Sequence, residues 1–378
     1  MDEITLSKMK LLMISGDRSI LRGKKGAFWY TLEEFHKEWD RIDIICPRVI
    51  QEMHPMEGTS RFGNVFFHPS PRGILFQKSW IQEKGMELLD EYHHDVITAH
   101  DYPPFFHGVG ANHLSRRTGT PFAVEIHHIV GFPIAASLAE FFGRVQSRLY
   151  LPWICKKAAA IRVVNHSIQN ILVSWKVPEK KIAVVPSSYL NHDLLLPNPT
   201  IQKTYDVACG GRLVANKGVA DVIRAVSLTP GVSLVIFGEG PLRSSLERLS
   251  QSLNITNRVH FAGWAEEGVD VYRTLQSAKI FVMNSKSEGG PRIALEAMAL
   301  GLPVISTRVG VMPDVIEDQK NGLFTTGEPK DLAAKIQMFL KDSSLRGRCG
   351  QEARKILDHF ERKTLIKRYA EFLQSFAK

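Results

Sequence analysis

Short apolar runs alternate with amphipathic stretches along this 378-residue chain, and no other feature constrains its fold as strongly. Helical patterns such as residues 28–39 and 167–175 lie between the runs, and apolar side chains spaced by three or four positions mark a further helix near 219–226. Continuous apolar strands that alternate with helices predict parallel sheets covered on both faces. The runs typical of β-strands occupy residues 10–15, 42–46, 65–68, 96–99, 122–126, 161–164, 182–185, 206–209, 233–237, 259–261, 280–283 and 304–306.

The alternation starts a second time near residue 206, which predicts two domains. A chain of this length divides naturally into two domains of ordinary size. Residues 187–204 contain two prolines and only weak periodicity, so we expect this segment to link the domains. The predicted fold is α/β, with two doubly wound Rossmann-like domains at 1–190 and 200–361. Because open sheets bind ligands outside the carboxyl ends of their strands, we expect the site in the cleft between the domains.

Charge and cysteine content narrow the class of protein. The formal net charge is +9, which favours an anionic partner such as a nucleotide, a nucleic acid or a membrane surface. Lysine and arginine never form a run of five, so we expect no general nucleic-acid binding. The four cysteines form no metal-binding spacing and are expected to be reduced, buried thiols of a cytoplasmic protein. No apolar run reaches about 18 residues, and the N-terminus does not resemble a secretory signal.

The segment 284–306 carries the first candidate for ligand chemistry. Glu288 and Glu296 are separated by seven residues, and a Gly-Gly-Pro turn follows the first of them. The local pattern is strand, polar loop and helix, and Pro291 is suited to the first helical position. The amides at Gly289 and Gly290 can bind an anion with help from the helix dipole. The alternative is that Glu288 is only a capping residue and Glu296 a solvated helix residue.

A second candidate anion site follows the strand at 206–209. Gly211 allows a sharp turn, Arg212 can contact two phosphate oxygens, and Lys217 adds a charge where the next helix is expected to begin. The alternative is a tight strand–helix turn with two solvated cations. Taken together with the first candidate, the arrangement suits a nucleotide-sugar substrate. The chain has no D-x-D sequence, so we expect no metal-bound diphosphate, no metal site and no cofactor.

These residues resemble family 4 glycosyltransferases of the GT-B fold, which belong to glycosyl transferases group 1. The resemblance rests on the Arg212/Lys217 pair, the Glu288–Glu296 spacing and the run that continues from Glu296 to residue 305. Further matching points are 238–241, 261–264 and 321–323. In that family the N-terminal domain mostly binds the acceptor and the C-terminal domain the donor. The last helix usually crosses back to the first domain, which suits the amphipathic pattern at 365–376 and would join residues 362–378 to that domain.

The resemblance implies roles for individual residues. Arg212 and Lys217 would neutralise the donor diphosphate, Glu288 would contact the transferred sugar, and Glu296 would bind ribose. His127, after the strand at 122–126, would reach the sugar, with His128 as the alternative and a purely structural histidine as a third reading. The implied catalytic set is Glu288, His127, Arg212 and Lys217, and the implied donor-binding set is Gly26, Gly211, Arg212, Lys217, Gly238, Gly263, Trp264, Glu288, Gly289, Gly290, Pro291, Arg292 and Glu296.

The function implied is a retaining, metal-independent transfer of a hexose-type sugar from a UDP- or GDP-sugar to a glycan or lipid-linked acceptor. A sugar phosphorylase, a nucleotide-sugar epimerase and a non-catalytic nucleotide-sugar-binding protein are the alternatives. The first glycine-rich loop and the segment 186–190 depart from the family pattern, which leaves the acceptor open. The basic amphipathic stretch 138–157 suits peripheral contact with an anionic membrane at its inner face, and the alternative is a helix that packs its apolar side on the core.

Overall fold

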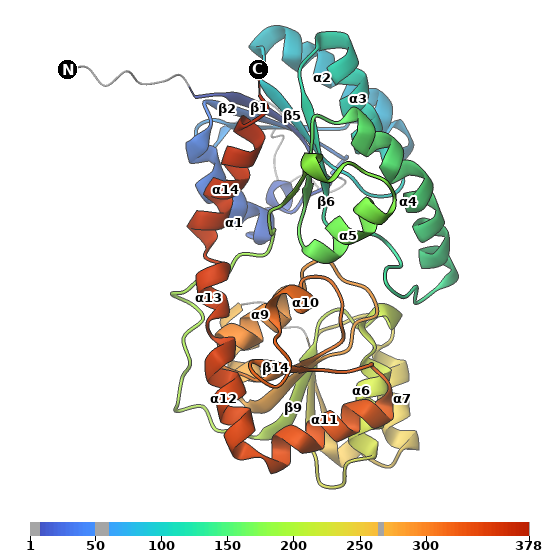
Figure 1. The fold of residues 1–378 in the computed structure, drawn as a ribbon, viewed down its shortest axis with the longest axis vertical. Coiled ribbons are helices and arrows are strands. Elements are labelled where there is room, and N and C mark those ends of the chain that lie inside the picture. The colour runs from blue at the N-terminus through green and yellow to red at the C-terminus, as the bar shows by residue number, and fades with distance from the viewer. Residues whose placement is uncertain (1–7, 50–59, 264–267, 378) are drawn as a thin grey trace, which may run out of the picture.

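The computed structural model describes residues 8–49, 60–263 and 268–377, and these residues form two lobes, each built on one sheet (Figure 1). The first sheet has the strand order β3-β4-β2-β1-β5-β6-β7-β8, and all its neighbours are parallel except the short β3 beside β4. Its strands are β1 (Lys10–Ile14), β2 (Arg41–Cys46), β3 (Ser60–Arg61), β4 (Val65–Pro69), β5 (Val96–His100), β6 (Phe122–Ile126), β7 (Ala160–Val163) and β8 (Ile182–Val184).

The second sheet is fully parallel and has the order β11-β10-β9-β12-β13-β14. In both sheets the order reverses beside the first strand, which is the place where an open α/β sheet leaves a crevice for a ligand. The sequence pattern predicted every strand except β3 and β14. The strands are β9 (Tyr205–Gly210), β10 (Leu234–Phe237), β11 (Val259–Gly263), β12 (Ala278–Met283), β13 (Val304–Ser306) and β14 (Gly322–Phe324).

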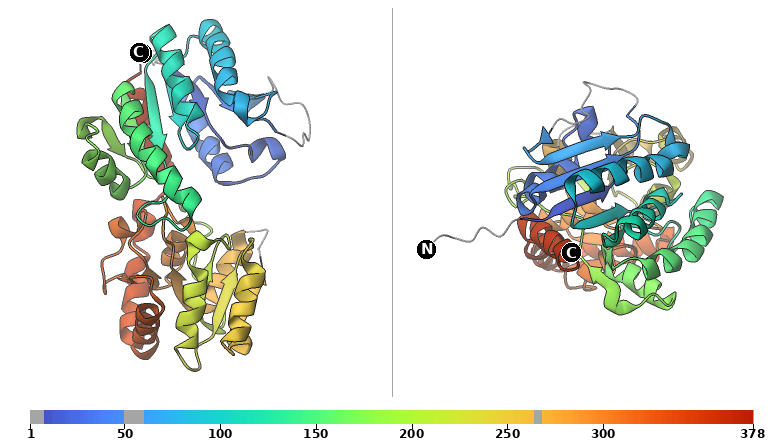
Figure 2. Two further views of the ribbon diagram at one scale, coloured as in Figure 1. Left: turned by 90° about the vertical axis from the view of Figure 1, so that its right-hand side faces the viewer. Right: turned by 90° about the horizontal axis from the view of Figure 1, so that it is seen from above.

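Helices cover both faces of each sheet (Figure 2). The helix α6 illustrates why they form, because its buried side chains, among them Val222, Ile223 and Val226, make one apolar stripe against β9. The helices of the first lobe are α1 (Ala27–Phe35), α2 (Gln77–Tyr92), α3 (Phe106–Thr118), α4 (Leu138–Lys157) and α5 (His166–Ser174); those that follow are α6 (Val219–Ser227), α7 (Arg243–Ser252), α8 (Gly268–Gln276), α9 (Arg292–Ala299), α10 (Met312–Val315), α11 (Pro329–Lys341), α12 (Ser343–Ala353), α13 (Ile356–His359) and α14 (Arg362–Gln374).

Two chain segments connect the lobes. Residues 185–204 contain no helix or strand apart from a bridge between Leu190 and Glu361. The helix α14 returns to the first lobe, where it lies beside α1 in Figure 1. Arg362 there pairs with Glu33 at 3.0 Å. The predicted pair of Rossmann-like sheets and the predicted return of the last helix are confirmed, while the numbered domain limits stay a prediction.

Candidate functional site

Three glycines meet at the carboxyl ends of β9, β10 and β11. Gly211 and Gly238 have φ values of 124° and 119°, a region that only glycine adopts readily. A Cβ on Gly238 would lie 2.0 Å from the carbonyl oxygen of Gly211, and the amide of Gly238 donates to Gly263 O at 2.6 Å. The three positions predicted from the sequence therefore form one glycine-lined floor. Trp264, predicted to line the base pocket, lies outside the described residues.

The two predicted phosphate-binding residues, Arg212 and Lys217, follow Gly211 in the chain. Arg212 is exposed, and its guanidinium has no hydrogen-bond or ion-pair partner within residues 8–49, 60–263 and 268–377. Lys217 lies in a 3-10 turn, η5 (Ala215–Lys217), and α6 begins only at Val219, so the prediction that Lys217 starts the helix was wrong. The cause is Gly218, whose φ of 62° ends the turn in a left-handed conformation before the helix starts. A Cβ on Gly211 would be 3.7 Å from Lys217 Cε, so the lysine side chain lies over the floor.

The loop between β12 and α9 brings Glu288 to Lys217. The Lys217 ammonium forms an ion pair with Glu288 Oε1, and Ser285 Oγ donates to the same oxygen at 2.8 Å. Asn216 ties the two loops together, because its Nδ2 donates to Ser287 O at 2.8 Å. The loops after β9 and β12, which are far apart in sequence, therefore form one site with two cations and one carboxylate.

The Gly-Gly-Pro turn faces the first lobe. Asn165 Nδ2 donates to Gly289 O at 2.7 Å, and a Cβ on Gly289 would lie 2.0 Å from His127 O. Neither the Gly289 nor the Gly290 amide has an acceptor within the part of the chain that the structure describes. The carbonyl groups thus join the lobes, and the amides remain available to an anion.

The helix α9 begins at Arg292, one residue later than predicted, because Pro291 has a non-helical ψ of 84° and acts as the N-cap. Glu296 is only 7% exposed. Its Oε1 accepts hydrogen bonds from Arg292 Nε at 2.9 Å and from Tyr272 OH at 3.0 Å. The reading of Glu296 as a solvated helix residue is therefore wrong, since the carboxylate is buried and oriented by two partners.

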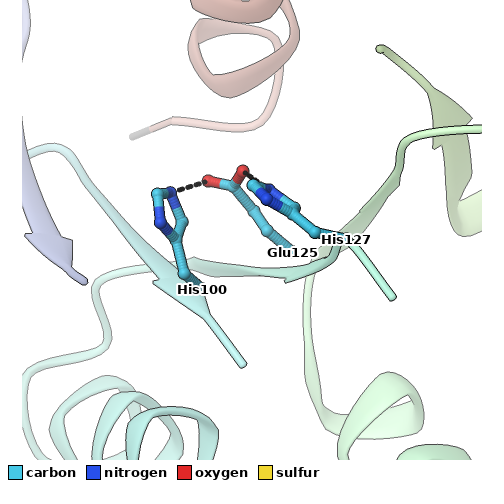
Figure 3. Close-up of side chains that lie close together, drawn as sticks. All are labelled: His100, Glu125 and His127. Carbon is cyan, nitrogen blue, oxygen red and sulfur yellow. Dashed lines mark hydrogen bonds and ion pairs between the residues drawn. The ribbon is translucent and has the colours of Figure 1, made fainter. Parts of the chain in front are cut away.

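A cavity of about 540 Å³ opens in the first lobe beside these loops. His127 follows β6, and its ring lines the cavity together with His100, which ends β5. Figure 3 shows the two rings on either side of Glu125. Each ring places Nε2 3.3 Å from a different oxygen of that carboxylate. Desolvation in the cavity wall lowers the pKa of His127 to about 4, so the ring is neutral at ordinary pH.

Glu125 is the best-connected side chain of the cavity. Arg162 Nη1 pairs with its Oε2 at 2.7 Å, while Thr98 Oγ1 at 2.5 Å and the Tyr369 hydroxyl donate to its Oε1. Burial alone would raise the pKa of Glu125, but the positive potential of His100 and Arg162 holds it well below its usual range. The carboxylate is therefore ionised although it is fully buried.

Within the described part of the chain, His100, Glu125 and His127 also form a group whose ligand atoms could hold a metal ion, since these atoms lie within 4.8 Å of one another. The surroundings do not fit a divalent cation. The Arg162 guanidinium already neutralises the carboxylate at 2.7 Å, and both carboxylate oxygens already accept hydrogen bonds. A cation here would have to displace these donors and stand beside a fixed positive charge.

The other predicted residues lie around the cleft. His128 Nε2 lies 2.5 Å from Ser287 Oγ, so this histidine contacts the Glu288 loop, whereas His127 belongs to the Glu125 network. Gly26 is the N-cap of α1. Its predicted place over the donor stays a prediction.

Sequence reasoning missed Glu125, Arg162 and Tyr369. For Glu125 and Arg162 a signal existed, because each is a single charged residue inside an otherwise apolar strand, and the two strands are consecutive. Two opposite charges in neighbouring buried strands can only be tolerated as a pair. Tyr369 gave no such signal, since its contact spans 244 residues of sequence.

Two family descriptions match the chain. The sequence model described as "Glycosyltransferase Family 4" matches residues 28–188, and the one described as "Glycosyl transferases group 1" matches residues 197–356. The matches fall on the first and the second lobe in turn.

Individual proteins resemble the chain as well. The lipopolysaccharide core biosynthesis glycosyltransferase LpsE of Rhizobium meliloti is 35% identical over 167 residues, which are 44% of this chain and 48% of LpsE. The chain thus spans about half the length of that relative. Sucrose-phosphate synthase from Thermosynechococcus elongatus has a similar structure, with a TM-score of 0.80, 19% identity and coverage of 97% of this chain and 99% of that one. HepE of Anabaena, solved with UDP and glucose, has a TM-score of 0.75, 19% identity and coverage of 97% and 100%.

Proposed function

The chain belongs to the family 4 glycosyltransferases, and from this premise we propose that it is a retaining enzyme that moves a hexose-type sugar from a UDP- or GDP-sugar to a glycan or lipid-linked acceptor. One observation carries the proposal. Arg212 and Lys217 lie in the loop after β9, the Gly289 and Gly290 amides lie in the loop after β12, and the Lys217–Glu288 ion pair joins these loops, while the described residues leave the guanidinium and both amides without partners. Such a set of donors matches the oxygens of a diphosphate.

The contacts predicted for Glu288 and Glu296 have support in the local geometry. Glu288 stands at the junction of the lobes and would accept hydrogen bonds from sugar hydroxyls, once a ligand draws Lys217 towards phosphate. Glu296 would bind ribose, and its second oxygen is left for that contact because Arg292 and Tyr272 both use Oε1. HepE was solved with UDP and glucose, which supports a UDP-sugar as the first donor to try.

Catalysis would be electrostatic. As the glycosidic bond breaks, negative charge develops on the leaving diphosphate, and Arg212, Lys217 and the amides would stabilise it without a metal ion. The acceptor hydroxyl would attack from the face that the diphosphate leaves, pass its proton to the diphosphate, and so retain the anomeric configuration. No separate nucleophile is required for this route.

Substitution of Arg212 by alanine tests the donor site. We expect transfer to fall about 100-fold or more, because removing one preorganised donor at a developing charge commonly costs that much. Glu288→Ala should lose activity similarly, and the fold should persist because both side chains lie in loops. Arg248→Ala, an exposed arginine on α7, is the matched control and should retain full activity. Near wild-type turnover by Arg212→Ala would disprove the assignment.

The helix α4 supports a lipid-linked acceptor, because its apolar stripe faces solvent. Leu138, Phe142 and Leu149 are 79%, 67% and 75% exposed, and Phe141 and Val145 lie on the same stripe. The alternative that this stripe packs on the core is therefore wrong. None of the helices in the described residues combines the length and apolar character that a membrane-spanning helix needs. The stripe instead fits the headgroup region of a bilayer, with its helix parallel to the surface.

A basic groove lies on the neighbouring helices α2 and α3. The helix α3 packs against both α2 and α4, and Lys78, His113, Arg116 and Arg117 line a groove of about 530 Å³ between α2 and α3. None of these four side chains has an ion-pair partner among the described residues. Lysines and arginines near an anionic surface contribute about 1 kcal/mol each to membrane binding. Anionic lipid is therefore the proposed occupant of this flank.

Co-sedimentation with liposomes tests the membrane contact. We expect binding to vesicles that contain anionic lipid and little binding to zwitterionic vesicles, with loss of binding in Phe142→Ser/Leu149→Ser. Leu228→Ser, which removes a half-exposed leucine from the second lobe, is the control. Equal sedimentation with both lipid compositions, or an unaffected double variant, would remove the proposal.

A further inference from the structure

The buried carboxylate of Glu125 has no role in the donor site, yet it touches both histidines of the cavity. We propose that Glu125 is a positioning residue that fixes the ring orientation and tautomer of His127, and that Tyr369 of α14 holds Glu125 in place for this task. The proposal rests on the proposed function in one respect, namely that His127 contacts the transferred sugar.

The hydrogen-bond chemistry fixes the tautomer. An ionised carboxylate only accepts hydrogen bonds, so a neutral imidazole that faces it must present its N–H. His127 Nε2 lies 3.3 Å from Glu125 Oε2, which assigns the proton to Nε2 and leaves Nδ1 as an acceptor. An unprotonated Nδ1 can accept a hydrogen bond from a sugar hydroxyl, whereas the opposite tautomer could not.

Glu125 can orient His127 because several hydrogen bonds fix the position of its own carboxylate. Glu125 is 1% exposed, and Thr98, Arg162 and Tyr369 hold its two oxygens from three different elements. The guanidinium of Arg162 stacks on the Tyr369 ring at 3.7 Å, and that ring stacks on Phe35 at 4.6 Å between centroids. The C-terminal helix therefore supplies part of the wall behind His127.

The same cluster reaches the other connection between the lobes. Arg162 Nε donates to Val185 O at 3.0 Å, and its Nη2 donates to Pro186 O at 2.9 Å, at the start of the linker. Both covalent connections between the lobes, the linker and α14, thus meet at the group that orients His127. A change in the position of either connection would therefore change the orientation of the His127 ring.

Histidine NMR on the full-length protein tests the tautomer without relying on activity. In ¹⁵N-histidine-labelled protein we expect His127 to be neutral and protonated at Nε2, with its signal identified by its loss in His127→Gln. In Glu125→Gln, whose amide can also donate, we expect the Nδ1-protonated form to gain population. A wild-type His127 protonated at Nδ1, or a tautomer that Glu125→Gln leaves unchanged, would overturn the proposal.

Kinetics then connect the tautomer with transfer. Tyr369→Phe keeps the aromatic stack and removes only the hydroxyl, so it should fold like the wild type even if Glu125→Gln does not. Loss of a hydrogen-bond partner behind a metal-bound histidine typically costs about 10-fold or more, and by analogy we expect kcat to fall by that order here, with an unchanged KM for the donor. Tyr205→Phe, on β9 outside the cavity, should leave kcat unchanged.

The outcomes separate this proposal from the proposed function. Unchanged kcat in Tyr369→Phe together with an unchanged tautomer would refute the positioning role. If the tautomer shifts as expected but His127→Gln still transfers sugar at the wild-type rate, the positioning role stands and the sugar contact assigned to His127 is what fails.

Discussion

At the scale of single residues, the charged groups of the cleft divide into two kinds. Glu125 and Arg162 are buried and fully engaged with one another and with their neighbours. Arg212, by contrast, is exposed and has no partner within the described residues. A fully paired buried charge serves to hold a structure, whereas an unpaired exposed cation beside open amides is available to a ligand. This contrast separates the groups that position from the groups that bind.

Asp101, which lines the cavity of the first lobe, differs from both kinds because its carboxyl is buried without a cation among the described residues to pair with it. Gly108 N donates to Oδ1 at 3.0 Å, and the Tyr150 hydroxyl beside the carboxyl also favours the ionised form, but burial outweighs both. Burial raises the pKa of Asp101 from 3.8 to about 7. Between pH 3.8 and about pH 7, the Asp101 carboxyl of the folded protein therefore keeps a proton that the unfolded chain has released. The contribution to stability is therefore complete below pH 3.8 and is lost as the pH rises through 7.

Asp101→Asn should remove this dependence on pH. We expect the Tm of the variant, relative to the wild type, to rise by at least roughly a few degrees between pH 5 and pH 8, because only the wild type has to bury a charge at the higher pH. Thermal melts at a series of pH values measure the difference. A Tm difference that is constant across this range would show that the carboxyl is not protonated in the folded protein.

At the scale of elements, the loop between β12 and α9 contacts residues of both lobes. It carries Glu288 towards Lys217, and it also carries the Gly289 carbonyl that Asn165 of the first lobe binds. Backbone contact between the lobes is possible here only because Gly289 has no side chain, since a Cβ would lie 2.0 Å from His127 O. The loop therefore couples the donor residues to the cavity of the first lobe.

Gly289→Ala should separate the lobes without unfolding either of them. We expect kcat to fall at least about tenfold, because a displacement of even 1 Å in the reacting groups can cost about 100-fold. The Tm should change little, since the loop is not part of a core. Gly347→Ala, on the exposed side of α12, is the matched control, because its Cβ would meet no atom within 4 Å. Equal effects of the two variants would contradict the role given to this contact.

Elements were also where sequence reasoning succeeded best. The strands around Phe122–Ile126 and Val304–Ser306 are apolar runs between turn residues, and such runs are decided locally. The strand β3 has two residues, too few to carry a pattern, and β14 is as short as β13 but begins at Gly322 after Asn321, a pair typical of a turn. The residues of the donor site could be named because they belong to a local motif. The Glu125 network could not, because it depends on which strands become neighbours and on where α14 returns.

At the scale of the whole molecule, the two lobes share one apolar core on the side where the linker and the C-terminal helices run between them. A single cluster of buried side chains includes Leu11 and Trp39 of the first lobe, Leu190 of the linker, and Phe281 and Leu295 of the second lobe. The helix α14 extends this cluster onto α1, as Figure 1 and the Phe35–Tyr369 stack show. We therefore expect ligand binding in the second lobe to stabilise the whole molecule.

Thermal unfolding with UDP or GDP in the presence of EDTA tests the central claim, that this cleft binds a nucleotide diphosphate through protein cations and amides alone. At a hundred times its Kd, a ligand adds about 2.7 kcal/mol of stability, which raises the Tm by several degrees. We predict such a rise with one of the two nucleotides in the wild type and Arg248→Ala, and its loss in Arg212→Ala. No rise with either nucleotide, or an equal rise in Arg212→Ala, would contradict the account.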